Sequence, residues 1–250
     1  MAALIAASLS AAHAQTITAW NFSSVVASAN SPAPTTGSGT ATIIGMTGGP
    51  LGDITATTGT ANTAFTEDLW RVRGATANGW VGTAAQYSQG AELDVSTIGY
   101  QNINFSFDWY STAQGIRDLQ FQYNLNTANA GGWVNFGGTS STGTYIATAK
   151  DFYNAPGSPT ITINLPSVAD NDASFGIRLV SAYDSTGNLA GQYASSTLVS
   201  GATVAYNGTS GNWRFGNMDF TGTIIPAPEP TTLALAGLGG LAALVAVRRR

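Results

Sequence analysis

The body of this chain is predicted to be an all-β fold in which two antiparallel sheets pack face to face. Short runs of residues alternate between apolar and polar side chains with a period of two. Segments rich in Gly, Ser, Asn and Pro separate these runs, and no stretch of the body keeps an apolar period of 3.6 residues. Strands with one dry and one wet face form a β-sandwich, and we expect its connectivity to be jelly-roll-like rather than immunoglobulin-like.

The clearest strand is 102–109, in which Ile103, Phe105, Phe107 and Trp109 fall on one face and polar residues on the other. Further strands are expected from similar alternation at 17–22, 41–44, 93–95, 118–125, 160–165, 175–179, 213–215 and 220–224.

Four segments between these strands have the composition of turns and loops. Residues 31–39 and 45–52 are rich in Pro, Thr and Gly and are predicted to be long loops. Residues 126–132 are predicted to form a hairpin turn, and 182–206 a long surface connection.

Composition excludes several functional classes. The 250 residues are 44% hydrophobic, which is enough for a core, and only 9% charged, with a net charge of −4. Basic residues of the body are scattered, so nucleic-acid binding is not expected. The sequence has no cysteine and a single histidine, His13. His13 lies in the N-terminal segment that is expected to be removed, so the body has neither residue. It therefore has no Ser-His-Asp triad, no cysteine nucleophile and none of the usual zinc, copper or iron sites.

The N-terminal residues 1–14 have the features of a signal peptide. An apolar run ends in Ala12-His13-Ala14, the small-x-small pattern that signal peptidase accepts, so we expect cleavage before Gln15. The β-sandwich domain is then expected to span residues 15–225.

The C-terminal residues 226–250 have three consecutive parts. Pro228-Glu229-Pro230 precedes an uncharged apolar run, 231–247, and the chain ends in Arg248, Arg249 and Arg250. An apolar helix of this length spans roughly 25 Å, so we expect a transmembrane helix. The arginines would stop it at the cytoplasmic side and leave the body outside.

This tripartite tail resembles the PEP-CTERM sorting signal of Gram-negative bacteria. The resemblance implies recognition by an exosortase, a membrane cysteine peptidase, and an association with exopolysaccharide production. A plain anchor that is never processed stays an alternative. The body also resembles a β-sandwich module of other PEP-CTERM proteins, through residues 19–22, 105–109, 119–123, 175–182 and 211–215. That resemblance implies no catalytic activity.

Two kinds of acidic site are candidates in the body. A glycosidase needs two carboxyl groups roughly 5–10 Å apart, and the candidates are Glu67, Asp68, Glu92, Asp94 and Asp108. Asp108 is expected on the polar face of its strand. A calcium ion could be held by Asp170 and Asp172, although the segment lacks the Gly and the distal Glu of an EF-hand loop. A solvated acidic turn is the simpler interpretation, and no cofactor is expected.

Aromatic residues outside the strand patterns are candidates for sugar contacts. Trp109 and Trp213 lie in strand patterns and are expected in the core. Six others lie nearer loops, where exposed rings could stack on a carbohydrate: Trp70, Trp80, Trp133, Tyr183, Tyr193 and Tyr206. Of these, Trp80, Trp133 and Tyr193 are the candidates for ligand contact.

The sequence therefore predicts an exported, non-catalytic structural or binding protein of the cell envelope or extracellular matrix. It is expected to be anchored in the inner membrane at least transiently and to contact signal peptidase, an exosortase and extracellular polysaccharide. A secreted glycan-active hydrolase with a carboxylate pair is the alternative.

Overall fold

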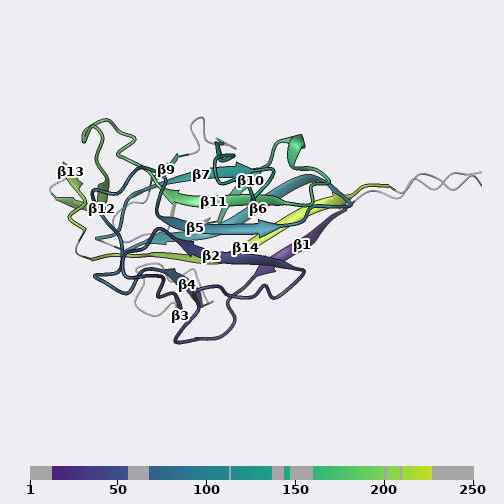
Figure 1. The fold of residues 1–250 in the computed structure, drawn as a ribbon, viewed down its shortest axis with the longest axis horizontal. Coiled ribbons are helices and arrows are strands. Elements are labelled where there is room, and N and C mark those ends of the chain that lie inside the picture. Colours follow the sequence, from purple (N-terminus) through teal and green to yellow (C-terminus); the bar gives the residue numbers. More distant parts are fainter. Residues whose placement is uncertain are drawn as a thin grey trace, which may run out of the picture.

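A computed structural model describes residues 13–55, 68–112, 114–136, 144–146, 160–199, 202–208 and 210–226. The described part of the body is built from two antiparallel sheets and a small hairpin (Figure 1). Sheet A has the strand order β10-β6-β14-β4-β3, and β1 also pairs with β14. Sheet B has the order β2-β5-β11-β7-β8, and β9 also pairs with β7.

The strands of sheet A are β1 (Ala14–Trp20), β3 (Asp53–Thr55), β4 (Leu69–Val72), β6 (Tyr100–Ser111), β10 (Thr160–Asn164) and β14 (Trp213–Ile224). Those of sheet B are β2 (Gly39–Ile44), β5 (Gly90–Val95), β7 (Asp118–Asn124), β8 (Val134–Asn135), β9 (Thr144–Ile146) and β11 (Phe175–Ser181). The hairpin consists of β12 (Ala194–Val199) and β13 (Ala202–Ala205), and a short 3₁₀ turn, η1, spans Ser167–Ala169.

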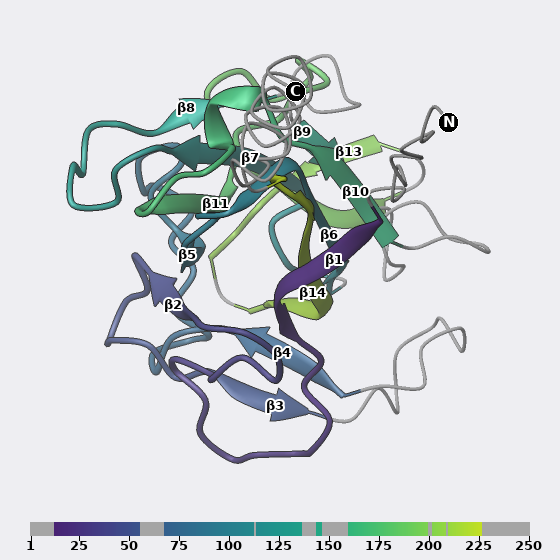
Figure 2. The ribbon, with the colours of Figure 1, turned by 90° about the vertical axis from the view of Figure 1, so that its right-hand side faces the viewer.

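The core lies between the two sheets. Figure 2 looks along the strands and shows β5, β7 and β11 on one side and β1, β6 and β14 on the other. Aromatic rings meet across this space: the Phe105 and Phe121 centroids are 6.2 Å apart, and those of Phe175 and Phe220 are 6.5 Å apart. Burial of one such side chain stabilises the fold by roughly 1.5–3 kcal/mol. This packing confirms a two-sheet antiparallel sandwich.

β14 extends along the whole of sheet A. It pairs with β6 from Trp213↔Ser111 to Ile224↔Tyr100, and with β4 over its first part and β1 over its second. Its residues span roughly 40 Å at 3.3 Å each. We call the end of the sandwich where β1 begins and β14 stops the tail end. There Ala14 pairs with Thr223, and the Ile225 amide donates to the Gly99 carbonyl at 2.8 Å.

Most predicted strands are present, but 213–215 and 220–224 are parts of a single strand, β14, and β9 was not predicted. Segment 126–132 does connect β7 to β8 as a hairpin turn. Segment 182–206 was predicted to be a loop, but it contains β12 and β13, and Ala194 and Ser196 are fully buried. Strands β3 and β4 were not predicted, because a strand of three or four residues is too short to display alternation.

The predicted targeting segments lie mostly outside the described residues. Ala12 falls outside, whereas Ala14 is the first residue of β1. The sorting motif Pro228, Glu229, Pro230 and the terminal Arg248, Arg249 and Arg250 also fall outside. In the part of the chain that the structure covers, no helix has the length and apolar character needed to cross a bilayer.

Candidate functional site

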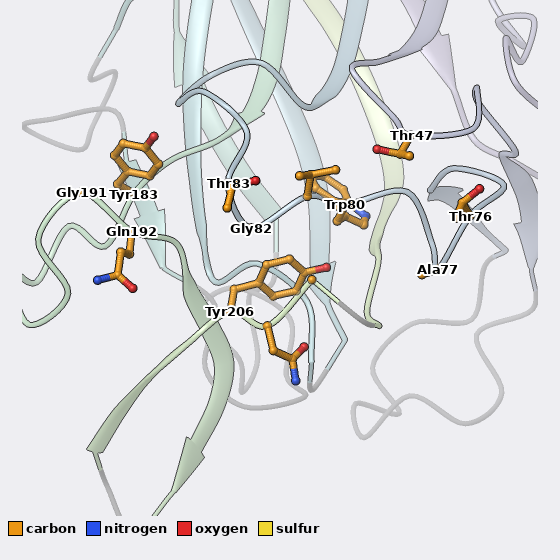
Figure 3. A pocket seen from close by; sticks show the side chains of 13 residues that line it. Thr47, Thr76, Ala77, Trp80, Gly82, Thr83, Tyr183, Gly191, Gln192 and Tyr206 are labelled. Atoms are coloured by element: carbon orange, nitrogen blue, oxygen red, sulfur yellow. The ribbon is translucent and has the colours of Figure 1, made fainter.

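An open cavity of about 740 Å³ lies at the end of the sandwich opposite the tail end (Figure 3). Its volume is within the range of small-ligand sites. Four connections line it: Thr47 follows β2, 76–83 join β4 to β5, 183–192 join β11 to β12, and 206–208 join β13 to β14. We call this cavity the distal cup.

Aromatic side chains form the floor of the distal cup. Trp80 is only 2% exposed, and its ring centroid lies 4.6 Å from that of Trp213, the first residue of β14. Trp213 is itself fixed by a 2.8 Å hydrogen bond from its Nε1 to the Ile116 carbonyl. Tyr206 lies beneath Trp80 in Figure 3 and donates its hydroxyl to the Ser210 carbonyl at 3.1 Å. The floor is therefore rigidly packed against the core.

A tight turn positions Trp80 from the N-terminal side. Gly79 has a φ of +75°, and its carbonyl accepts a 3.0 Å hydrogen bond from the Thr47 amide. A Cβ at Gly79 would lie 2.4 Å from the Gly74 Cα, so a larger residue does not fit there.

A buried glutamine holds the main chain on the other side of Trp80. The fully buried Gln89 side chain accepts a hydrogen bond from the Val81 amide at 2.6 Å and donates one to the Val81 carbonyl at 3.1 Å. Without Gln89, the Val81 amide and carbonyl would lose their hydrogen-bond partner, at a cost of about 1–3 kcal/mol.

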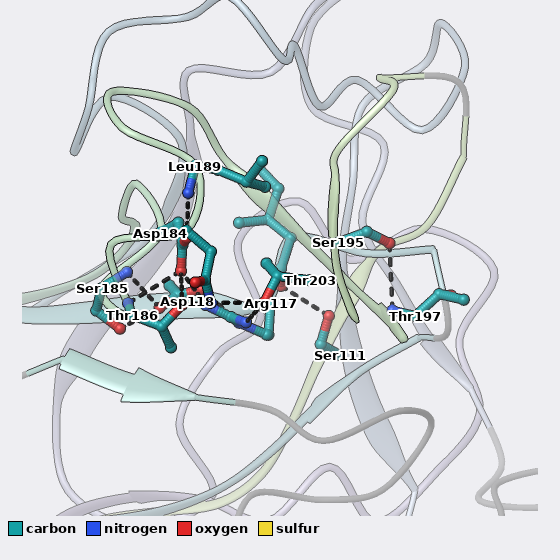
Figure 4. Close-up of polar contacts among 12 residues, drawn as sticks. Ser111, Arg117, Asp118, Asp184, Ser185, Thr186, Leu189, Ser195, Thr197 and Thr203 are labelled. Carbon is teal, nitrogen blue, oxygen red and sulfur yellow. Dashed lines mark hydrogen bonds and ion pairs between the residues drawn. The ribbon is translucent and has the colours of Figure 1, made fainter. Parts of the chain in front are cut away.

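The opposite wall of the cup is held by Asp184. Its carboxylate accepts hydrogen bonds from the Thr186 amide at 3.0 Å and the Leu189 amide at 2.6 Å (Figure 4). Its own amide donates to the Gln192 carbonyl at 2.8 Å. Burial alone would raise the pKa of Asp184, but hydrogen bonds, including one from Arg117, outweigh it and lower the pKa to about 2.

Arg117 connects this wall to sheet B. Its guanidinium pairs with Asp184 and, through Nε at 2.8 Å, with Asp118 at the start of β7. The Asp118 side chain is completely buried. Burial raises the pKa of Asp118, against hydrogen bonds from Arg117 and Ser185. These ion pairs fix the 183–192 connection to the sandwich.

The lining of the cup carries no charge at neutral pH, because none of its residues is an acid, a lysine, an arginine or a histidine. Burial raises the pKa of Tyr206, which keeps that phenol neutral. The exposed side chains of Thr47, Thr76, Thr83 and Gln192 make no hydrogen bond to the described residues. The cup therefore offers free hydroxyl and amide groups above an aromatic floor.

The three aromatic residues predicted to contact a ligand do not come together. Trp80 lies in the cup, but as floor rather than as a projecting ring. Tyr193 is a core residue, 1% exposed, and its hydroxyl donates to the Ala85 carbonyl at 2.8 Å. Trp133 lies on the outer face of sheet B, where the Arg178 guanidinium carbon is 4.0 Å from its ring centroid. The core positions predicted for Trp109 and Trp213 are confirmed.

Sequence reasoning placed Tyr206 near a loop but missed Thr47, Thr83 and Gln192, since each comes from a different connection. One signal was present: residues 74–91, which supply much of the lining, contain no charged side chain.

The acidic candidates are mostly separated. Glu67 falls outside the described residues. Asp108, expected on the polar face of its strand as a catalytic acid or a solvated side chain, is 1% exposed and accepts hydrogen bonds from Thr160 at 2.7 Å and Asn217 at 2.8 Å. Burial raises the pKa of Asp108. Its amide partner Asn217 reaches it from a bulge in β14, at a φ of 43°.

Only Glu92 and Asp94, among the acidic candidates that the structure describes, are neighbours on one strand face. They lie two residues apart on β5, so both side chains point away from the core. The pKa of Asp94 is raised, mainly by burial and secondly by the negative charge of Glu92. Glu92 accepts a 2.6 Å hydrogen bond from Arg178. Asp68 lies before β4, away from this pair in the sequence.

Side chains of the acidic turn considered for calcium accept hydrogen bonds from main-chain amides. Asp172 accepts from the Ser174 amide at 2.7 Å, and Asn171 accepts from the Gly99 amide at 2.9 Å. One Asp170 oxygen is buried without a partner. The described residues contain no group of three acidic or histidine side chains that could hold a metal ion. Asp170 and Asp172 thus lack a third carboxylate.

Comparison with known proteins identifies one segment. No curated protein sequence matches the chain. Similar solved structures include the K1 cleaved adhesin domain of Lys-gingipain from Porphyromonas gingivalis W83, at 10% identity and a TM-score of 0.40, covering 83% of this chain and 97% of that one. The K2 cleaved adhesin domain of Lys-gingipain has 12% identity and a TM-score of 0.35, covering 74% and 90%. These scores are too low to carry an argument.

The informative match is to a family model described as the PEP-CTERM protein-sorting motif, at residues 226–250. This motif implies export, processing by an exosortase-type membrane protein and sorting to the cell envelope or the exterior. The chain carries a PEP-CTERM sorting motif and is an exported protein sorted through its C-terminal tail.

Proposed function

We propose that this chain is a non-catalytic protein of the cell envelope or extracellular matrix that holds the distal cup away from the membrane and binds exopolysaccharide. The observation that carries this proposal is the position of the cup and the tail at opposite ends of β14. Trp213, under the cup floor, begins that strand, and Pro226 follows shortly after its end.

The same arrangement supports the predicted targeting steps. Signal-peptide cleavage before Gln15 would remove only the first residue of β1 and leave its remaining pairs with β14 intact. A membrane helix within 226–250 would then extend from the tail end, two residues beyond β14. The transmembrane helix, the signal peptide and the jelly-roll connectivity stay predictions.

Tail deletion tests the sorting half of this proposal. A chain ending at Ile225 is expected to leave the membrane fraction, and mass spectrometry of the envelope pool is expected to find full-length chains processed near Pro228-Glu229-Pro230. An intact Arg250 on the surface-exposed pool would contradict processing. Equal fractionation of the full-length and shortened chains would contradict tail-dependent sorting.

A second candidate function is glycan hydrolysis by Glu92 and Asp94. The observation that favours it is their placement on one face with a raised pKa at Asp94, because glycosidases combine one protonated and one ionised carboxyl group. Release of reducing ends from polysaccharide by the wild-type chain, abolished by Glu92→Gln, would establish this activity and refute the non-catalytic proposal.

A further inference from the structure

We infer that the distal cup selects a neutral glycan and excludes polymers of uronic acid or other anionic sugars. This inference rests on the proposed function and names the class of ligand that the cup would take. It follows from three properties of the cup: its missing charge, its free hydrogen-bonding groups and one unpaired donor in its floor.

The missing charge decides against an anionic ligand. A carboxylate entering the cup would exchange water for hydroxyls and amides and would find no cation among the lining residues. Arg117, which supports the wall, is already paired with Asp118 and Asp184. The net charge of −4 adds weak repulsion of any polyanion.

The free groups match the surface of a neutral sugar. Hydroxyls of Thr47, Thr76 and Thr83 both donate and accept, and so does the Gln192 amide as a whole. A sugar ring presents the same dual chemistry at each hydroxyl. Thr47 and Thr76 lie on one side of the cup and Gln192 on the other in Figure 3, so a ligand between them would be contacted from both walls.

The floor supplies an unpaired donor. The Trp80 Nε1 is buried and has no hydrogen-bond partner in the described structure, and the same is true of the Trp133 Nε1 outside the cup. The equivalent groups of Trp20, Trp70 and Trp213 each bond to a carbonyl. Protein donors that are buried this deeply normally have partners. Because this nitrogen is covered in the described structure, a ligand hydroxyl would pair with it only after a local shift of the cup floor.

Specificity can be tested by calorimetric titration of the full-length chain in detergent. The neutral probes are soluble oligomers of glucan, mannan and galactan, and the anionic probe is an oligogalacturonate of the same length. We expect at least one neutral oligomer to bind and the oligogalacturonate to bind at least tenfold more weakly. Affinity should not change with added salt or between mildly acidic and mildly basic pH, because the lining holds no carboxyl, imidazole, amine or guanidinium group.

Two variants locate the binding in the cup. Gln192→Ala and Thr83→Ala remove exposed side chains without internal partners, and each should weaken binding roughly two- to tenfold, as expected for one hydrogen bond. Asn164→Ala, at an exposed position of β10 outside the cup, is the matched control and should bind as the wild type does. Trp80→Phe keeps a packed ring but removes the donor. It should weaken binding while the variant chain itself stays fully folded.

Tighter binding of the oligogalacturonate would overturn the inference but leave the exported binding role intact. Binding that is unchanged in both cup variants would overturn the assignment of the site. Failure of every neutral oligomer to bind, or binding of an unglycosylated peptide instead, would also overturn it. None of these results depends on tail-directed sorting, which the deletion of residues 226–250 tests separately.

Discussion

The two ends of β14 are held by different kinds of contact. At the tail end, β1, β6 and β14 lie in one ladder, and main-chain hydrogen bonds continue up to Ile225. At the cup end, irregular connections replace the ladder, and buried side chains such as Gln89 and Asp184 hold them. Regular pairing suits the end that leads into the sorting tail, whereas loops fixed by side chains can present a shaped surface.

This difference also sets where each end is vulnerable. The ladder is held by many equivalent main-chain hydrogen bonds, so a side-chain substitution there leaves most main-chain groups paired. The cup depends on a few side chains that each satisfy several main-chain groups. Substitutions of equal size are therefore expected to have different local consequences at the two ends.

The largest effect is expected from Trp213→Ala, at the floor of the cup. Removing this fully buried ring should lower the free energy of unfolding by about 3–5 kcal/mol. Phe220→Ala, farther along β14 and equally buried, is the matched control and should cost a similar amount. Hydrogen exchange should separate them, because only Trp213→Ala should expose the amides of residues 76–83. Equal exchange in both variants would show that the two ends are not independent.

Asp184→Asn should have the next largest effect. It weakens hydrogen bonds from the Thr186 and Leu189 amides and the pairing with Arg117, at a cost of roughly 1.5–3 kcal/mol. A lowered folded-state pKa gives stability that is present above the unfolded value of 3.8 and lost as the pH falls to about 2. The difference between wild type and variant should therefore shrink over that interval in acid unfolding curves. A constant difference would contradict the assignment.

Gln89→Leu should destabilise the other wall of the cup by about 1–3 kcal/mol, because the Val81 amide and carbonyl lose their partner in a buried site. Thermal unfolding followed by near-ultraviolet circular dichroism measures this change, and the signal of Trp80 should alter before global unfolding. Gln122→Leu is the comparison on β7: within the described part of the chain it loses one bond to Asn135 and none to the main chain, so its cost should be smaller.

Glu92→Gln should have the smallest effect, less than about 1 kcal/mol, because the pair with Arg178 is partly exposed to solvent. Chemical unfolding measures it, with Arg178→Lys as the companion variant. A loss of several kcal/mol would mean that the outer face of sheet B is a structural centre comparable to the cup.

Sequence patterns predicted the sheets better than the cup. Strand β6 shows its buried face in its sequence, since Ile103, Phe105, Phe107 and Trp109 alternate with polar residues over a long run. The same reasoning did not predict the burial of Asp108, because alternation gives the face of a residue but not what covers that face. Segment 182–206 was missed because its Ser, Gly and Ala content resembles that of loops.

The site was harder to predict because its residues are brought together by tertiary structure. Trp80 was a candidate on composition alone, but its partners Tyr206 and Gln192 come from distant connections. Tyr193 belongs to the same connection as Gln192 and points into the core instead. The sorting tail is the opposite case: its motif is contiguous, so the sequence alone was sufficient to recognise it.

The most direct test of the central claim is a distance measurement on the full-length chain in lipid vesicles. Because the sequence lacks cysteine, single dyes can be attached at Thr83→Cys in the cup and at Ile98→Cys, which is exposed beside Gly99 at the tail end. With an energy acceptor in the lipid, we predict strong transfer from position 98 and much weaker transfer from position 83, since roughly 40 Å separates the two ends. Equal transfer from both positions would contradict a cup held away from the membrane.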